Sequence, residues 1–178
     1  MSRRALILLA VAALSGGFRP AASAKPLVSY SDTEEDDRKG ANKEVAAVQV
    51  KLDEIQARIA RKEIPPIEFE LGSALLKDSA KPALEMVAKL LTRHLRLKLL
   101  VFGHTCNVGG RKHNLELSQK RAEAVKYYLV ELGVMVESIR AKGYGMDKPL
   151  VENDTEENRA KNRRVEFLVT NRDWASIY

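Results

Sequence analysis

The sequence predicts an α/β domain, an α+β sandwich of one mixed sheet with helices packed on one face, preceded by a helical stalk. Three observations support this fold class. Apolar and polar residues alternate at 67–71 and 164–170, as in strands with one buried face. Apolar residues recur at helical spacing within 84–95 and 122–132. Glycine and proline residues separate these segments, so strands and helices are expected to alternate along the chain.

Four strands and three helices are expected in the domain. The expected strands are residues 67–71, 97–102, 138–142 and 164–170. Each is short, and turn-forming residues such as Gly103 and Gly143 lie at or near the strand ends. With a helix in each gap, the order is βαβαβ(α)β.

Helix boundaries are marked by capping residues. Asp78 or Ser79 can cap the first helix, with Pro82 in its first turn, and Asn114 can cap the second, which Gly133 terminates. The expected apolar stripe of the first helix is Leu84, Val87, Leu91 and Leu95. Residues 156–161 have the composition of a third, short helix.

The N-terminus has the pattern of a cleavable signal peptide. Arg3 and Arg4 precede the apolar run 5–14, and the small-residue site Ala22-Ser23-Ala24 follows. The apolar run is too short to cross a bilayer as a stable helix. We therefore expect residues 1–24 to be removed on export and the protein to reside in the periplasm, with association to the outer membrane left open.

Two segments separate the signal peptide from the domain at 65–178. Residues 25–40 hold the acidic run 32–37 and few apolar side chains, so we expect an acidic, flexible leader. Residues 41–64 are predicted to form an amphipathic helix, ended by Pro65-Pro66. Its apolar residues have the spacing of a coiled coil over about two heptads; they are Val45, Val48, Leu52, Ile55 and Ile59. The helix can pair two subunits into a homodimer, bind an outer-membrane or periplasmic protein, or lie against the domain.

Charge and cysteine content limit the possible functions. The formal charge is +6 for the whole chain, and loss of residues 1–24, with three arginines and no acids, lowers it to +3. This mild excess does not indicate nucleic acid, which needs a concentrated basic face. Cys106 is the only cysteine and cannot form an intrachain disulfide. No motif indicates a cofactor.

Five short blocks follow one another over about 100 residues. They are Ser73-Ala74-Leu75-Leu76, Gly103-His104-Thr105, Leu117-Ser118 with Arg121-Ala122, Gly143-Tyr144-Gly145, and Asn162-Arg163-Arg164-Val165. In this order and spacing, residues 67–169 resemble the OmpA-like C-terminal domain, a peptidoglycan-associating family.

The resemblance implies non-covalent binding of peptidoglycan through the diaminopimelate of its stem peptides, without catalysis. In that family an aspartate after the GHT turn and an arginine in the following helix hold the ligand. Diaminopimelate is zwitterionic, so a carboxylate can hold its ammonium while a guanidinium pairs with its carboxylate. Arg121 matches the arginine. Asn114 and Thr105 match supporting polar positions, and Glu70 is a candidate for the rim of the pocket.

Cys106 stands where the family has its aspartate. Loss of a charged hydrogen-bond partner at a partly buried site typically costs about 1.5–3 kcal/mol. Three interpretations follow. The pocket binds the wall weakly or has lost binding; it binds a variant stem peptide through the remaining contacts; or Cys106 has a thiol function, chiefly an intermolecular disulfide.

Other chemistry is less well supported. His104, Cys106 and His113 are metal-ligating types within ten residues, but a structural zinc site takes four ligands and no fourth is evident, so no metal is expected. No catalytic constellation can be named, so we do not expect an enzyme. The alternative from another class is a periplasmic assembly protein that uses residues 41–64 for oligomerisation or docking.

Overall fold

The computed structural model describes residues 30–176, so the predicted signal peptide lies outside the described residues. The helices are α1 (Tyr30–Ala60), α2 (Lys81–Leu91), α3 (Arg111–Glu131) and α4 (Glu156–Asn162). The strands are β1 (Lys98–His104), β2 (Ile139–Gly145) and β3 (Val165–Thr170). Single 3-10 turns occupy Asp78–Ala80, Val136–Ser138 and Trp174–Ser176.

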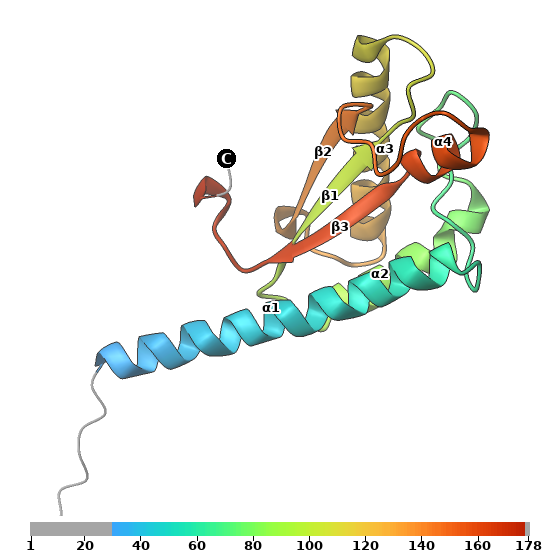
Figure 1. Cartoon of the computed structure of the whole chain (residues 1–178). Helices are drawn as coiled ribbons and strands as arrows, with labels where there is room; N and C mark the ends of the chain where they lie inside the picture. The colour runs from blue at the N-terminus through green and yellow to red at the C-terminus, as the bar shows by residue number, and fades with distance from the viewer. Residues whose placement is uncertain (1–29, 177–178) are drawn as a thin grey trace, which may run out of the picture.

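The three strands form one mixed sheet in the order β2-β1-β3. β1 pairs parallel with β2 and antiparallel with β3. Alternate residues of β3, Val165, Phe167 and Val169, are buried, as the predicted period of two requires. α3 covers one face of the sheet, and α2 lies beside α1 at its lower end (Figure 1). The predicted fold class, a mixed sheet with helices, is confirmed.

α3 lies unusually close to the sheet because two glycines face it. Gly103 of β1 and Gly143 of β2 are paired across the strands. A Cβ on Gly103 would meet the carbonyl oxygen of Ser118, and a Cβ on Gly143 would meet the backbone nitrogen of Gln119. The hydroxyl of Ser118 then accepts a hydrogen bond from the Gly145 N–H at 2.8 Å. The two glycines of the sheet therefore determine how closely α3 packs against it.

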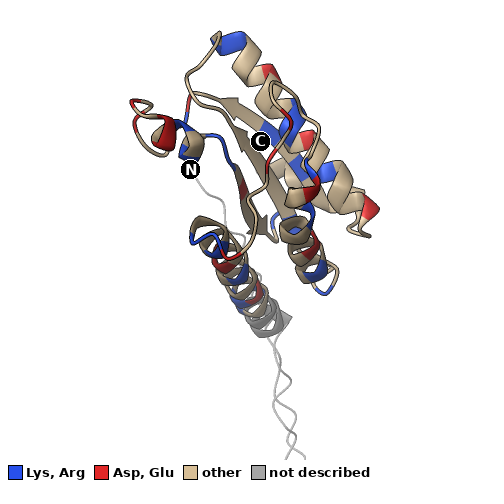
Figure 2. Ribbon diagram, turned by 90° about the vertical axis from the view of Figure 1, so that its right-hand side faces the viewer, with Lys and Arg blue, Asp and Glu red and all other residues tan. Residues whose placement is uncertain are grey.

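α1 packs on the domain with its apolar stripe. Val48 and Leu52 are fully buried and Ile55 is 8% exposed, all within the hydrophobic core. The stripe faces α2 and β3. Of the options that the sequence left open, the described structure shows the helix lying against its own domain. The N-terminal part of α1 extends past the sheet (Figure 1). Acidic and basic residues alternate with others along the coloured part of this helix (Figure 2).

Glutamine side chains from two helices close both edges of the sheet. Gln49 of α1 donates to the Phe167 carbonyl at 3.2 Å and accepts from the Val169 N–H at 2.9 Å. On the opposite edge, Gln119 of α3 accepts from the Gly143 N–H at 2.7 Å and donates to the carbonyl of Ala141 at 3.3 Å. Each amide satisfies edge-strand groups that are otherwise available for pairing with another chain.

Two predicted segments differ from the structure. Residues 67–71 do not join the sheet: they fold back in a hairpin through Gly72, whose φ is +64°, and make one bridge, Phe69 with Leu76. The segment predicted as a leader at 25–40 is helical from Tyr30.

Three predicted helix details are also wrong. Ala80 is the N-cap of α2 and no side chain caps this helix, so neither Asp78 nor Ser79 has the predicted role. α3 begins at Arg111 with Gly110 as its N-cap, so Asn114 lies inside the first turn and does not cap it. Leu95 lies beyond the end of α2 and is 63% exposed. Pro82 in the first turn of α2 and Gly133 after α3, with φ +94°, are as predicted. Among the helices of residues 30–176, none combines the length and apolarity needed to cross a bilayer.

Removal of the buried Leu52 side chain tests the docking of α1. We expect Leu52→Ala to lower the free energy of unfolding by about 2–5 kcal/mol, independently of protein concentration, because the cavity opens within one chain. Val50→Ala is the control, since Val50 is 67% exposed on the same helix and its change should stay within about 0.5 kcal/mol. Equal urea midpoints for the two variants would contradict the packing.

The close packing of α3 on the sheet predicts that replacement of glycine by alanine has opposite effects on stability at Gly143 and at Gly40. Gly143→Ala should destabilise the fold by about 1–3 kcal/mol or more, because the obstructing atoms belong to the backbone of Gln119. Gly40→Ala, in α1 with open space around it, should instead stabilise the protein by about 0.5–1 kcal/mol. Thermal unfolding of both variants measures the two signs, and stabilisation by Gly143→Ala would overturn this account.

Candidate ligand-binding site

A pocket of about 380 Å³ opens between the hairpin, α3 and the C-terminal end of α4. Phe69, Glu70 and Leu71 line it from the hairpin side. The other side is cationic, with Arg121 from α3 and Arg163 and Arg164 from the segment between α4 and β3. His104, at the end of β1, also contributes to the wall. The pocket therefore gathers three guanidinium groups.

Arg121 is held in place from the hairpin. Its Nε donates to the Ser73 carbonyl at 2.9 Å, and its Cζ lies 5.0 Å from the centre of the Phe69 ring. Burial lowers the pKa of Arg121, and the positive charge of Arg163 lowers it further, while Cys106 acts in the opposite direction. The group remains protonated at any physiological pH. Within the described residues, Arg121 has no carboxylate partner.

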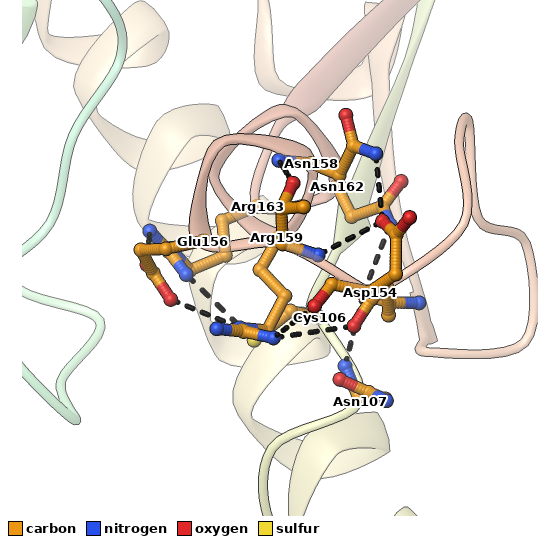
Figure 3. A network of polar contacts seen from close by, with 10 residues as sticks. Cys106, Asn107, Asp154, Glu156, Asn158, Arg159, Asn162 and Arg163 are labelled. Carbon is orange, nitrogen blue, oxygen red and sulfur yellow. Dashed lines mark hydrogen bonds and ion pairs between the residues drawn. The ribbon is translucent and has the colours of Figure 1, made fainter.

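Cys106 is buried, with 6% of its surface exposed, and does not line the pocket. Arg163 reaches it from the segment between α4 and β3. Nη1 of Arg163 lies 3.9 Å from the Cys106 sulfur, and its Nη2 donates to Glu156 at 2.7 Å. Glu156 also receives Arg159 Nε at 2.9 Å (Figure 3). The Glu156 carboxylate thus pairs with two arginines, and one of them, Arg163, also contacts the Cys106 thiol.

The loop that carries this network is organised by Asn162. The side chain is fully buried. Its Oδ1 accepts from the N–H groups of Leu150 and Val151 at 2.8 and 3.2 Å. Its Nδ2 donates to the Val151 carbonyl at 2.8 Å and to Asn153 Oδ1 at 2.9 Å (Figure 3). The side-chain amide of Asn162 therefore holds residues 150–153 in place next to the backbone of Arg163.

The other residues singled out in the sequence occupy different places. Thr105 is buried next to Cys106; its N–H donates to the Gly145 carbonyl at 2.9 Å, and its hydroxyl has no partner in the described part of the chain. Asn114 is also buried and donates to the Val108 carbonyl at 3.0 Å, so it braces the turn before α3. Neither lines the pocket, whereas Glu70 is exposed at its rim.

His104 is buried yet lacks a hydrogen-bond partner at either ring nitrogen among residues 30–176. Its ring stacks on Tyr144 at a centroid distance of 5.5 Å, and Glu166 lies 3.6 Å from Nε2, too far for a hydrogen bond. Burial, followed by the positive charge of Arg164, lowers the pKa of His104 to about 4. The imidazole is therefore neutral near pH 7.

The sequence also raised Cys106 as a metal ligand and as the partner in an intermolecular disulfide. In residues 30–176, no three His, Cys, Asp or Glu side chains gather closely enough to hold a metal ion. The Cys106 side chain is buried beside Arg163, so an intermolecular disulfide requires the structure around it to open first.

Sequence reasoning missed the part that Arg163 plays in the pocket. Arg163 belongs to a basic cluster with Arg159, Lys161 and Arg164, whose interleaved acids predict an ion pair for one arginine and a solvated face for the rest. The structure pairs three of them, Arg159 and Arg163 with Glu156 and Arg164 with Glu166. The reach of Arg163 to Cys106 spans 57 residues of sequence and has no local signal. Phe69 was missed as well, because its contact with Arg121 depends on the hairpin leaving the sheet.

Comparison with known proteins agrees with the resemblance seen in the sequence. Residues 68–163 match the OmpA family. Over 113 residues the chain is 36% identical to the outer membrane porin F of Pseudomonas fluorescens, which covers 64% of this chain and 34% of that protein. Over 98 residues it is 40% identical to the peptidoglycan-associated lipoprotein of Buchnera aphidicola, covering 55% and 57% respectively. The chain spans less than two thirds of either relative.

Solved structures show the same domain. The peptidoglycan-associated lipoprotein of Burkholderia pseudomallei superposes with a TM-score of 0.55 at 33% identity, covering 58% of this chain and 88% of that one. The C-terminal domain of Helicobacter pylori MotB gives a TM-score of 0.55 at 29% identity, with 64% and 89% covered.

The depressed pKa of His104 predicts a stability change at mildly acidic pH. Because the unfolded histidine titrates near 6.5 and the folded one near 4, the unfolded state binds more protons between these values. The stabilisation is complete above pH 6.5 and is lost as the pH falls towards 4, by at most about 1.4 kcal/mol per pH unit from this group.

Urea unfolding of wild type and His104→Phe at pH 7.0, 5.5 and 4.5 measures the effect. The phenylalanine retains a ring against Tyr144 but binds no proton, so its stability should fall less steeply with acid. His113→Phe, at an exposed position, is the control and should keep the wild-type slope. Identical slopes for all three proteins would contradict the assignment.

Proposed function

This chain belongs to the OmpA family, and we propose that it is a non-catalytic cell-envelope protein that binds peptidoglycan non-covalently through the pocket around Arg121. The ligand is a stem peptide of the diaminopimelate type. The protein acts in the periplasm after export, and its contact with the outer membrane is indirect. Relatives named for the outer membrane and for peptidoglycan association support this location and ligand.

The observation that carries the proposal is the charge state of Arg121. A half-buried guanidinium without a carboxylate partner in the described residues is costly unless an anion completes its pairing. Its Nε already donates to the Ser73 carbonyl, and the side chain lines the pocket, so its two terminal nitrogens are available to donate to a carboxylate there. The free α-carboxylate of a stem peptide has the matching geometry and charge.

The remaining candidate residues have supporting roles. Asn114 and Thr105 position the turn that holds Cys106, and Glu70 borders the entrance. The rival function, assembly through the coiled-coil-like stripe of α1, is less favoured. Val48 and Leu52, the centre of that stripe, are fully buried against the chain's own core.

Sedimentation with purified peptidoglycan sacculi tests the proposal. We expect wild type to sediment and Arg121→Ala to lose roughly 10- to 150-fold in apparent affinity, which corresponds to a charged hydrogen bond of about 1.5–3 kcal/mol. Lys120→Ala is the matched control, because it removes one positive charge from the neighbouring exposed position on α3. It should bind like wild type.

The Cys106→Asp variant distinguishes loss of wall binding in this chain from a wrong assignment of the pocket. If wild type remains in the supernatant while Cys106→Asp sediments, the pocket is correct and wall binding has been lost in this chain. If neither protein sediments, or if Arg121→Ala and Lys120→Ala behave alike, the assignment of the pocket is wrong.

A further inference from the structure

We propose that the face of the sheet opposite α3 is a second contact surface for the wall, and that it binds carboxylates of the stem peptides next to the one in the pocket. This inference rests on the proposed function, because it extends the same ligand from one stem peptide to the polymer that carries it. The face is open to solvent, positively charged and continuous with the pocket.

Alternate residues of the three strands point away from α3. Because Gly103 and Gly143 face α3, their neighbours Phe102 and Lys142 point to the other side of the sheet, where they are cross-strand partners. The same alternation places Leu168 of β3 on this face, and its side chain is 44% exposed. A ligand can therefore reach the strands from this side.

The outward-pointing positions carry more cations than acids. Lys98, Arg140 and Lys142 occupy such positions on β1 and β2. Within the three described strands, Glu166 is the only acid at an outward-pointing position, and Arg164 pairs with it at 2.6 Å. A concentration of positive charge on one face attracts an anionic partner. Carboxylates of a polymer complement this face.

Aromatic rings hold several of these cations without neutralising their charge. The ammonium groups of Lys142 and Lys148 lie 5.3 and 3.9 Å from the centre of the Tyr144 ring. The guanidinium of Arg140 lies 5.3 Å from the centre of the Trp174 ring. Arg140 and Lys148 are exposed, and neither has a carboxylate partner in the part of the chain that the structure describes. Both are available to pair with a ligand carboxylate.

The basic face and the pocket share residues at the end of the sheet. His104 and Arg164 line the pocket, and the His104 N–H donates to the Arg164 carbonyl at 3.0 Å. The His104 ring stacks on Tyr144, and Arg164 donates to the Lys148 carbonyl at 3.4 Å. Arg140 lies four residues before Tyr144 on β2, roughly 13 Å along the strand. A stem peptide in the pocket therefore leaves neighbouring units of the wall beside this row of cations.

The test compares a polymeric and a monomeric form of the same ligand. Intact sacculi, and the disaccharide-peptide monomers that muramidase releases from them, are each titrated with the full-length protein and with the double variant Arg140→Gln/Lys142→Gln. We expect the double variant to bind sacculi roughly 3- to 30-fold more weakly, because two charged contacts with neighbouring stem peptides are lost. Its affinity for the monomer should stay within about twofold of wild type, because the pocket around Arg121 alone holds the monomer.

Retained binding of the monomer also shows that the double variant is folded. Lys112→Gln/Lys120→Gln is the matched control, because it removes two positive charges from exposed positions of α3, on the other side of the sheet. This control should bind sacculi like wild type. Added salt should weaken the binding of wild type to sacculi more steeply than that of Arg140→Gln/Lys142→Gln, because salt screens exposed charges.

The outcomes distinguish this inference from the proposed function. If the double variant binds sacculi as tightly as wild type, or if the α3 control loses as much affinity, the inference is wrong and the pocket assignment stands. If the double variant loses affinity for the monomer in the same proportion as for sacculi, the two cations act through the pocket, and the inference is again wrong. Failure of wild type to bind either preparation contradicts the proposed function, and the inference with it.

Discussion

The close contact between α3 and the two paired glycines of the sheet determines most of the site. Ser118 and Gln119 lie against Gly103 and Gly143, where no Cβ could be accommodated without moving backbone. Arg121 follows Ser118 by three residues and so shares its helix face within one turn. Cys106 follows Gly103 by three residues, just beyond the end of β1. Locking helix to sheet at the glycines therefore fixes the arginine relative to the cysteine.

The small size of the sheet explains why α1, which was predicted as a stalk, packs against the domain. Three strands leave two open edges, and one edge is β3 because residues 67–71 form a hairpin instead of a fourth strand. Gln49 of α1 bonds the backbone of that edge, while Leu52 enters the core beside it. The same departure of the hairpin brings Phe69 and Ser73 to Arg121. The hairpin thus leaves β3 as an open edge of the sheet, which α1 covers, and forms one wall of the pocket.

Local sequence signals predicted the elements whose causes are local. The alternation at 164–170, Pro82 and Gly133 each correspond to a backbone preference that acts over a few residues, and these positions agree with the structure. The alternation at 67–71 carried the same signal, but strand formation needs a partner, and the turn at Gly72 pairs the segment with Leu76 instead.

The site was predictable only in part for the same reason. Arg121 stood out because it falls in one of the recognisable blocks, and Cys106 because it directly follows another. Arg163 also falls in such a block, but its contact with Cys106 could not be inferred, because that contact depends on a loop that Asn162 holds through four hydrogen bonds to residues 150–153. That His104 lacks a hydrogen-bond partner among residues 30–176 could not be inferred either, since burial and partners are properties of the folded structure.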